Sequence, residues 1–139
     1  MEYIDGAPLT DAASALSLDQ KAELMCKVVA AVHHLHQHQI IHRDLKPGNI
    51  LVGPNLEPKI LDFGLACPFG SENLLTGTPE YMSPEQVECL PVDERTDIFA
   101  LGLIAFEMLS GVSSVTLKAT LGADKTGASL VPVIRTLIS

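Results

Sequence analysis

Two short segments carry side chains that suit metal-assisted chemistry. The first runs from His42 to Asn49 and contains Asp44 and Lys46, and the second begins at Asp62. Mg²⁺ is a hard cation that prefers oxygen ligands, and the Asn49 amide and the Asp62 carboxylate can supply them. These residue types therefore suit chemistry that a bound metal ion assists.

Short β-prone runs should hold these segments in place. Residues 50–52 and 59–61 are separated by the turn-forming residues Gly53, Pro54 and Asn55, so we expect a hairpin. Asn49 and Asp62 would each lie at the end of one of its strands. Residues 40–41 form a further short β-prone run.

Two helices are expected to build the core. The first runs from about Leu18 to His38, and Ser17 with Gln20 has the form of a capping box at its start. Its buried stripe should consist of residues at helical spacing: Leu24, Val28, Ala31 and Leu35. The second helix is expected over residues 96–110, with Gly111 as its stop. Its apolar residues occupy nearly every side, which is typical of a buried helix.

Composition and charge restrict the class of protein. The 139 residues suffice for one domain, and a hydrophobic content of 47% indicates a globular chain. A net charge of −8 argues against binding to nucleic acid or anionic lipid. The three cysteines form no C-x-x-C pair, which favours reduced thiols and a cytoplasmic location. The start has no signal-peptide pattern, and the most apolar stretch, residues 98–109, is too short to span a bilayer.

Three motifs follow one another in a specific order. They are H-R-D-L-K-P-G-N at residues 42–49, D-F-G at 62–64 and G-T-P-E-Y-M-S-P-E at 77–85. Together they resemble the catalytic loop, the magnesium-binding loop and the end of the activation segment of protein kinases, and in style the bacterial-type serine/threonine kinases. The resemblance covers roughly residues 1–111. It implies an α+β fold: the mainly helical carboxyl-terminal lobe with a small β-hairpin, without the amino-terminal lobe.

The resemblance implies a role for each polar residue. Asp44 would accept the proton of the substrate hydroxyl, and Lys46 would place a positive charge beside the transferred group. Asp62 would hold the Mg²⁺ that bridges the phosphates, and Asn49 the second ion. The implied cofactors are ATP and Mg²⁺, with Mn²⁺ as an alternative. The acceptor would be a protein Ser or Thr, because Lys46 and Thr78 match the serine/threonine pattern, in which the Thr hydroxyl meets the catalytic Asp and Lys.

Further residues are assigned by the same resemblance. Residues 1–6 resemble the hinge between kinase lobes: Met1 would lie beside the adenine, the backbones of Glu2 and Ile4 would bond its edge, and Leu51 would lie beneath the ring. Arg43 would receive a phosphate carried by the activation loop. The candidate acceptors of that phosphate are Ser71 and Thr76.

The remaining motif residues are expected to be structural: His42, Phe63, Gly64, Glu85 and Asp97. Asp97 would accept backbone amides of the catalytic loop, and His42 would pack against Phe63. Gly64 would allow the turn after Phe63. Glu85 would pair with a later arginine, for which Arg135 is the candidate.

A zinc site is the alternative interpretation of the histidines. His34 and His38 are four residues apart on the first expected helix, but no Glu or Cys joins them nearby, and a zinc site needs three or four ligands. We therefore favour a solvated helix end. Cys67 is interpreted as a small buried residue rather than a reactive thiol.

Part of the family pattern is absent from the 139 residues. They contain no G-x-G-x-x-G loop, and no strand lysine with a helix glutamate to pair it. We divide this partial kinase domain into a hinge (1–6), a core (17–111) and a divergent tail (112–139) with a short helix near 130–138. Two functions stay open: part of a serine/threonine kinase completed by a missing lobe or another chain, or a truncated lobe without catalysis that acts as a binding or regulatory module.

Overall fold

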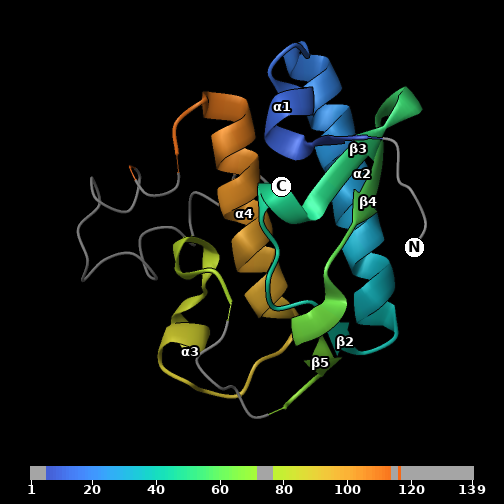
Figure 1. Ribbon diagram of the computed structural model, residues 1–139. Coiled ribbons are helices and arrows are strands. Elements are labelled where there is room, and N and C mark those ends of the chain that lie inside the picture. The colour runs from blue at the N-terminus through green and yellow to red at the C-terminus, as the bar shows by residue number, and fades with distance from the viewer. Residues whose placement is uncertain (1–5, 72–76, 114–115, 117–139) are drawn as a thin grey trace.

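The structure is a computed structural model that describes residues 6–71, 77–113 and 116 (Figure 1). Several predicted features lie outside the described residues. They are the hinge residues Met1, Glu2 and Ile4, the candidate acceptor Thr76, Arg135 and the helix expected near 130–138.

Within the described residues the chain forms four α-helices and two small antiparallel sheets, as the expected α+β class requires. The helices are α1 (Leu9–Ala13), α2 (Leu18–Gln37), α3 (Pro84–Val87) and α4 (Glu94–Ser110). One sheet has the order β1 (Ala7–Pro8), β3 (Ile50–Gly53), β4 (Glu57–Ile60), and the other pairs β2 (Ile40–Ile41) with β5 (Cys67–Pro68). Helices α2 and α4 pack on each other, and β4 packs on α2 (Figure 1).

Helix α2 begins as its sequence predicts. The Ser17 hydroxyl accepts the Gln20 amide proton at 3.2 Å, and Gln20 Oε1 accepts the Ser17 amide proton at 3.0 Å. The buried residues of this helix are Leu24, Met25, Val28 and Val32. Ala31 and Leu35, which we had expected to be buried, are only half-buried. The buried stripe is wider and slightly rotated because the helix contacts both α4 and β4.

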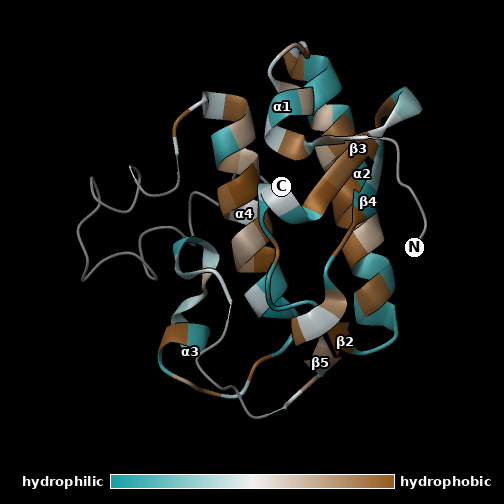
Figure 2. Ribbon diagram, in the orientation of Figure 1, coloured by the Kyte–Doolittle hydropathy of each residue, from teal (hydrophilic) through white to brown (hydrophobic). Residues whose placement is uncertain are grey.

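Helix α4 is the buried helix of the domain. Residues 99–105 are all buried, although they cover every side of the helix. The helix starts two residues earlier than predicted, because the Asp93 carboxylate caps it by accepting the Arg95 amide proton at 2.9 Å. It ends at Gly111, as predicted, with φ of 73°. Figure 2 shows the apolar residues of α4 and β3, which contribute to one core.

The predicted hairpin is present. Ile50 pairs with Ile60 and Gly53 with Glu57. Its strands are longer than expected, because only residues 54–56 connect them, and Asn55 and Leu56 both have positive φ, at 60° and 56°. Lys27 of α2 holds this turn, with its Nζ 2.9 Å from the Asn55 carbonyl oxygen.

The sequence did not predict α1, which follows directly on Pro8. Two of its residues, Leu9 and Ala13, are buried in the core.

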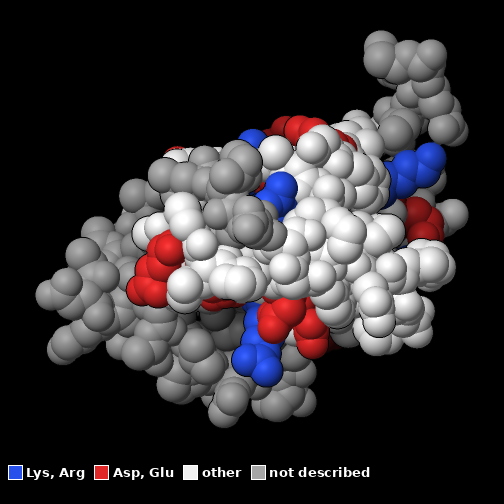
Figure 3. All heavy atoms as spheres, turned by 90° about the horizontal axis from the view of Figure 1, so that it is seen from below, with Lys and Arg blue, Asp and Glu red and all other residues white. Residues whose placement is uncertain are grey.

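The charged groups on the surface are dispersed. On the face seen in Figure 3, the described Lys and Arg side chains are separated from one another. No described helix is long and apolar enough to cross a membrane.

Candidate active site

The hairpin brings Asn49 and Asp62 to the same end of the sheet. The Leu61 amide donates to the Asn49 carbonyl oxygen at 2.8 Å, which extends the pairing of Ile50 with Ile60 by one step. Asp62 then turns sharply, with φ of 60°. We had expected Gly64 to provide the unusual backbone conformation here, but the left-handed residue is Asp62. A Cβ atom on Gly64 would lie 3.3 Å from Asp62 Oδ1, so this glycine leaves room for the carboxylate.

Asp44 lies at the centre of a network of short polar contacts. Its Oδ1 accepts hydrogen bonds from the Thr78 amide at 3.0 Å and the Thr78 hydroxyl at 2.8 Å. Lys46 Nζ donates to that same hydroxyl at 2.9 Å. The other oxygen, Oδ2, lies 3.4 Å from Asn49 Nδ2 and 3.9 Å from Lys46 Nζ. The contacts that the resemblance implied between Thr78, Asp44 and Lys46 are therefore present.

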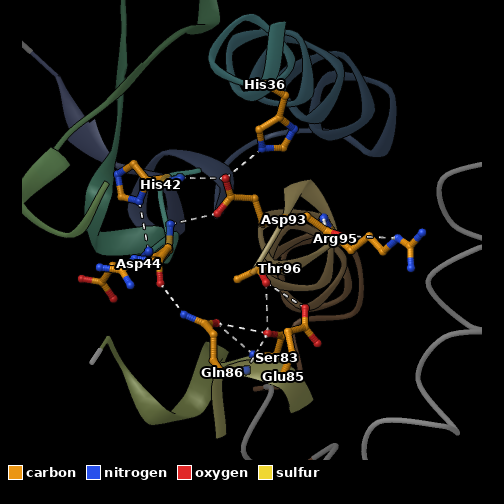
Figure 4. A network of polar contacts seen from close by, with 11 residues as sticks. His36, His42, Asp44, Ser83, Glu85, Gln86, Asp93, Arg95 and Thr96 are labelled. Carbon is orange, nitrogen blue, oxygen red and sulfur yellow. Dashed lines mark hydrogen bonds and ion pairs between the residues drawn. The ribbon is translucent and has the colours of Figure 1, made fainter. Parts of the chain in front are cut away.

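Asp97 holds the backbone of the segment 42–49, a contact that the resemblance implied. Asp97 Oδ2 accepts the His42 amide proton at 2.9 Å, and Oδ1 accepts the Arg43 amide proton at 3.0 Å (Figure 4). Arg43 has φ of 71°, a conformation that costs about 1–2 kcal/mol for a residue with a side chain. The two bonds to Asp97 stabilise this strained turn, which directs the next residue, Asp44.

His42 has a single consistent hydrogen-bonding pattern. Its Nδ1 lies 3.2 Å from the Asp44 amide and must accept that proton, so Nε2 is the nitrogen that donates to the Leu61 carbonyl oxygen at 2.8 Å. Its ring meets that of Phe63 edge-on, with the centroids 5.3 Å apart, as predicted. The buried imidazole thereby links the catalytic loop to the strand end that precedes Asp62.

Glu85 and Gln86 attach the segment 77–86 to α4 and to the segment 42–49. Glu85 Oε1 accepts a hydrogen bond from the Thr96 hydroxyl at 2.8 Å. Gln86 Nε2 donates to the Arg43 carbonyl oxygen at 2.9 Å (Figure 4). The expected partner of Glu85, Arg135, lies outside the described residues.

The residues present fit a magnesium ion. Asn49 is 8% exposed, and its Nδ2 donates to the Asp44 carbonyl oxygen at 2.9 Å. Among the described residues no hydrogen bond reaches Asn49 Oδ1, and the exposed Asp62 carboxylate makes no hydrogen bond or ion pair. These two oxygen donors suit Mg²⁺, which is commonly held by few protein ligands together with water and phosphate oxygens.

The histidine pair does not gather further ligands. His38 Nδ1 donates to the His34 carbonyl oxygen at 2.9 Å, and the two rings lie 4.8 Å apart. In the part of the chain that the structure describes, no group of three or more His, Cys, Asp or Glu side chains could hold a metal ion. Cys67, which we interpreted as buried, is only half-buried in β5.

Two of the predicted regulatory residues, Arg43 and Ser71, each donate to a nearby backbone carbonyl oxygen. Arg43 Nε donates to the Leu65 carbonyl oxygen at 2.6 Å, and the Ser71 hydroxyl donates to the Pro68 carbonyl oxygen at 2.7 Å. No hydrogen bond joins Arg43 to Ser71 among the residues described. Leu51 is half-buried in β3 and pairs with Pro8, just after the predicted hinge.

Two residues of this site were missed by sequence reasoning. His36 Nε2 lies 2.8 Å from Asp97 Oδ2, although α2 gives no local signal that would distinguish His36 from His33, His34 or His38. Gln86 forms the second capping box with Ser83. Its spacing from Ser83 was a usable signal for the cap, but not for the contact with Arg43.

Comparisons with known proteins agree with this geometry. The family described as "Protein kinase domain" matches residues 1–128. Similar proteins include the serine/threonine-protein kinases max-2 of Caenorhabditis elegans (38% identical), PknB of Mycobacterium leprae (37%) and PrkC of Bacillus subtilis (38%). Each match covers 80% of this chain, and the chain spans only 18% or 19% of the length of these relatives.

A solved structure is also similar. The Cydia pomonella granulovirus kinase PK-1 has a TM-score of 0.75 and 27% sequence identity, and the match covers 81% of this chain and 43% of that one. The expected resemblance to a kinase domain, and to bacterial serine/threonine kinases among others, is confirmed.

Proposed function

The chain belongs to the protein kinase family, and on this premise we propose that it is part of a serine/threonine kinase. The reaction would transfer the γ-phosphoryl group of ATP to a Ser or Thr hydroxyl of a protein. One observation carries the proposal: Asp44, Thr78 and Lys46 form one hydrogen-bonded group beside Asn49. We also propose that the described residues correspond to the large, mainly helical lobe, and that the protein acts in the cytoplasm.

The chain's own residues would divide the work at this site. Asp44 Oδ1 is engaged by Thr78, so Oδ2 is the oxygen that would accept the proton of an incoming hydroxyl. Lys46 would stabilise negative charge on the transferred group. Asn49 and Asp62 would hold Mg²⁺, which when bound neutralises charge on the phosphate oxygens. Glu2, Ile4 and Leu51 would contact the adenine.

A second candidate function is a kinase-derived module that binds partners without turnover. Phe63, beside the site, is 48% exposed, and a large apolar side chain in this position suits contact with another protein surface. On either proposal we expect these 139 residues alone to bind ATP weakly and to show negligible turnover, since ligand sites normally enclose most of their ligand.

A chimera tests the kinase proposal. The amino-terminal lobe of the M. leprae relative would be fused before Met1, and phosphate transfer from labelled ATP to casein would be measured. We expect the chimera to transfer phosphate to Ser and Thr. The rate of transfer should fall at least about a hundredfold in the Asp44→Asn variant. The rate should be unchanged by Asp19→Asn, the same substitution at an exposed position of α2. A folded, ATP-binding chimera without transfer would favour the binding module.

A further inference from the structure

The chain uses the same capping motif twice, in two different surroundings. Ser17 and Gln20 cap α2, and Ser83 and Gln86 cap α3. In both, the glutamine Oε1 accepts the serine amide proton at 3.0 Å. Glutamate serves this motif as well as glutamine does. The cap therefore does not explain why residue 86 should be an amide.

Gln86 differs from Gln20 in burial and in what its other amide atom does. Gln20 is exposed, whereas Gln86 is 2% exposed. While Gln86 Oε1 accepts the Ser83 amide proton, its Nε2 donates to the Arg43 carbonyl oxygen at 2.9 Å. One side chain thus joins the start of α3 to the catalytic loop, 43 residues away (Figure 4). A carboxylate could keep the first bond but not the second.

The peptide groups of Arg43 are held from two sides. Asp97 accepts the Arg43 amide proton, and Gln86 donates to the Arg43 carbonyl oxygen. Gly77 lies against the same carbonyl: a Cβ atom there would be 3.3 Å from the Arg43 oxygen and 3.7 Å from Gln86 Nε2. Gly77 also has φ of 109°, which favours glycine. Both ends of segment 77–86 therefore meet the residue that precedes Asp44.

We propose that Gln86 is a positioning residue, whose amide transmits the placement of the activation-segment end to the catalytic loop. It acts through the Arg43 carbonyl group and so on the backbone that carries Asp44. The value of this coupling for phosphoryl transfer rests on the proposed function, but the coupling itself does not. An experiment that measures the backbone of residues 43 and 44 therefore tests the coupling separately from the proposed kinase function.

The sharpest test is Gln86→Glu, which keeps size, helix cap and acceptor but removes the donor. Amide hydrogen exchange would be followed by NMR on the 139-residue chain. At pH 7 we expect protection of the Arg43 and Asp44 amides to fall about tenfold, because the partly buried Arg43 carbonyl group loses its donor and meets a negative oxygen. Protection of Val28 in the α2 core should change by less than about twofold, since that core does not contact the bond. The matched Gln20→Glu should change neither.

The pH dependence distinguishes positioning from a general loss of packing. Burial and the nearby carbonyl oxygen raise the pKa of the introduced carboxyl in the folded chain. The protonated form can donate to the Arg43 carbonyl oxygen again. The protection of the Arg43 and Asp44 amides, expressed relative to wild type at each pH, should therefore recover as the pH falls from 8 to 5. At the lower pH the introduced carboxyl is protonated in the folded chain.

A second variant guards against misfolding. Gln86→Met retains the volume but cannot donate at any pH, so its loss of protection at Arg43 and Asp44 should not depend on pH. The proposal is overturned if Gln86→Glu leaves both amides as protected as wild type. It is equally overturned if Val28 loses as much protection as they do, or if the Gln86→Glu effect does not vary with pH. None of these outcomes depends on whether the chain transfers phosphate.

Discussion

His36 donates a hydrogen bond from Nε2 to Oδ2 of Asp97 at 2.8 Å and so connects α2 to the carboxylate that holds the catalytic loop. The Asp97 side chain is 1% exposed. Its acceptor oxygens are satisfied by His36 and by the backbone amides of His42 and Arg43, and in the described part of the chain no Lys or Arg side chain forms an ion pair with it.

Replacing His36 should therefore destabilise the domain more than replacing a neighbouring histidine. We expect His36→Leu to lower the free energy of unfolding by about 1–3 kcal/mol, because a buried carboxylate loses a donor. His36→Gln should cost less, since a glutamine amide can donate from a similar position. Urea denaturation measures both. His33→Leu is the control, because His33 is exposed on the same helix. Equal effects of His36→Leu and His33→Leu would contradict the assignment.

Metal binding at Asn49 and Asp62 can be tested with Mn²⁺, whose unpaired electrons broaden nearby NMR signals. We expect broadening at residues 49 and 61–62 in the wild-type chain. Asp62→Asn should raise the Mn²⁺ concentration needed for the same broadening at least about tenfold, because a charged ligand becomes neutral. Asparagine is the appropriate replacement, since it tolerates the left-handed backbone that Asp62 adopts. Broadening unaffected by Asp62→Asn, or as sensitive to Asp19→Asn, would refute this site.

The core assignment predicts a contrast within α4. Ile104 is 1% exposed and belongs to the main core, whereas Ile98 is 38% exposed. Ile104→Ala should lower the free energy of unfolding by about 2–5 kcal/mol, because it leaves a cavity. Ile98→Ala should change it by about 0.5 kcal/mol or less. Thermal or urea unfolding gives both values, and similar losses at the two positions would show that α4 is packed differently.

Two glycines without close neighbours should respond differently to the same substitution. A Cβ atom on Gly111 or on Gly48 would meet nothing within 4 Å, but only Gly111 has a positive φ, of 73°. Gly111→Ala should therefore cost about 1 kcal/mol from backbone strain alone. Gly48→Ala should be close to neutral in stability. Circular dichroism during urea unfolding would measure the difference, and a neutral Gly111→Ala would argue against the left-handed end of α4.

The sequence by itself determined what depends on neighbouring residues. The Ser17 and Gln20 cap, the hairpin after Asn49, the stop at Gly111 and the order of the three motifs all follow from short-range patterns, because hydrogen bonding and backbone preference act within a few residues. The motifs also indicated the family. The contacts of Asp97 with the catalytic loop came from that resemblance rather than from periodicity.

Tertiary structure decided which of several residues with similar local sequence contacts a residue far away in the chain. His36 contacts Asp97 from 61 residues away, while three other histidines of similar local pattern do not. Gln86 reaches Arg43 across 43 residues, while Gln20, in the same motif, stays exposed. Helix α1 and the wider buried face of α2 likewise depend on packing. A hydrogen bond between distant residues depends on how whole elements pack, and no local preference of the chain specifies that.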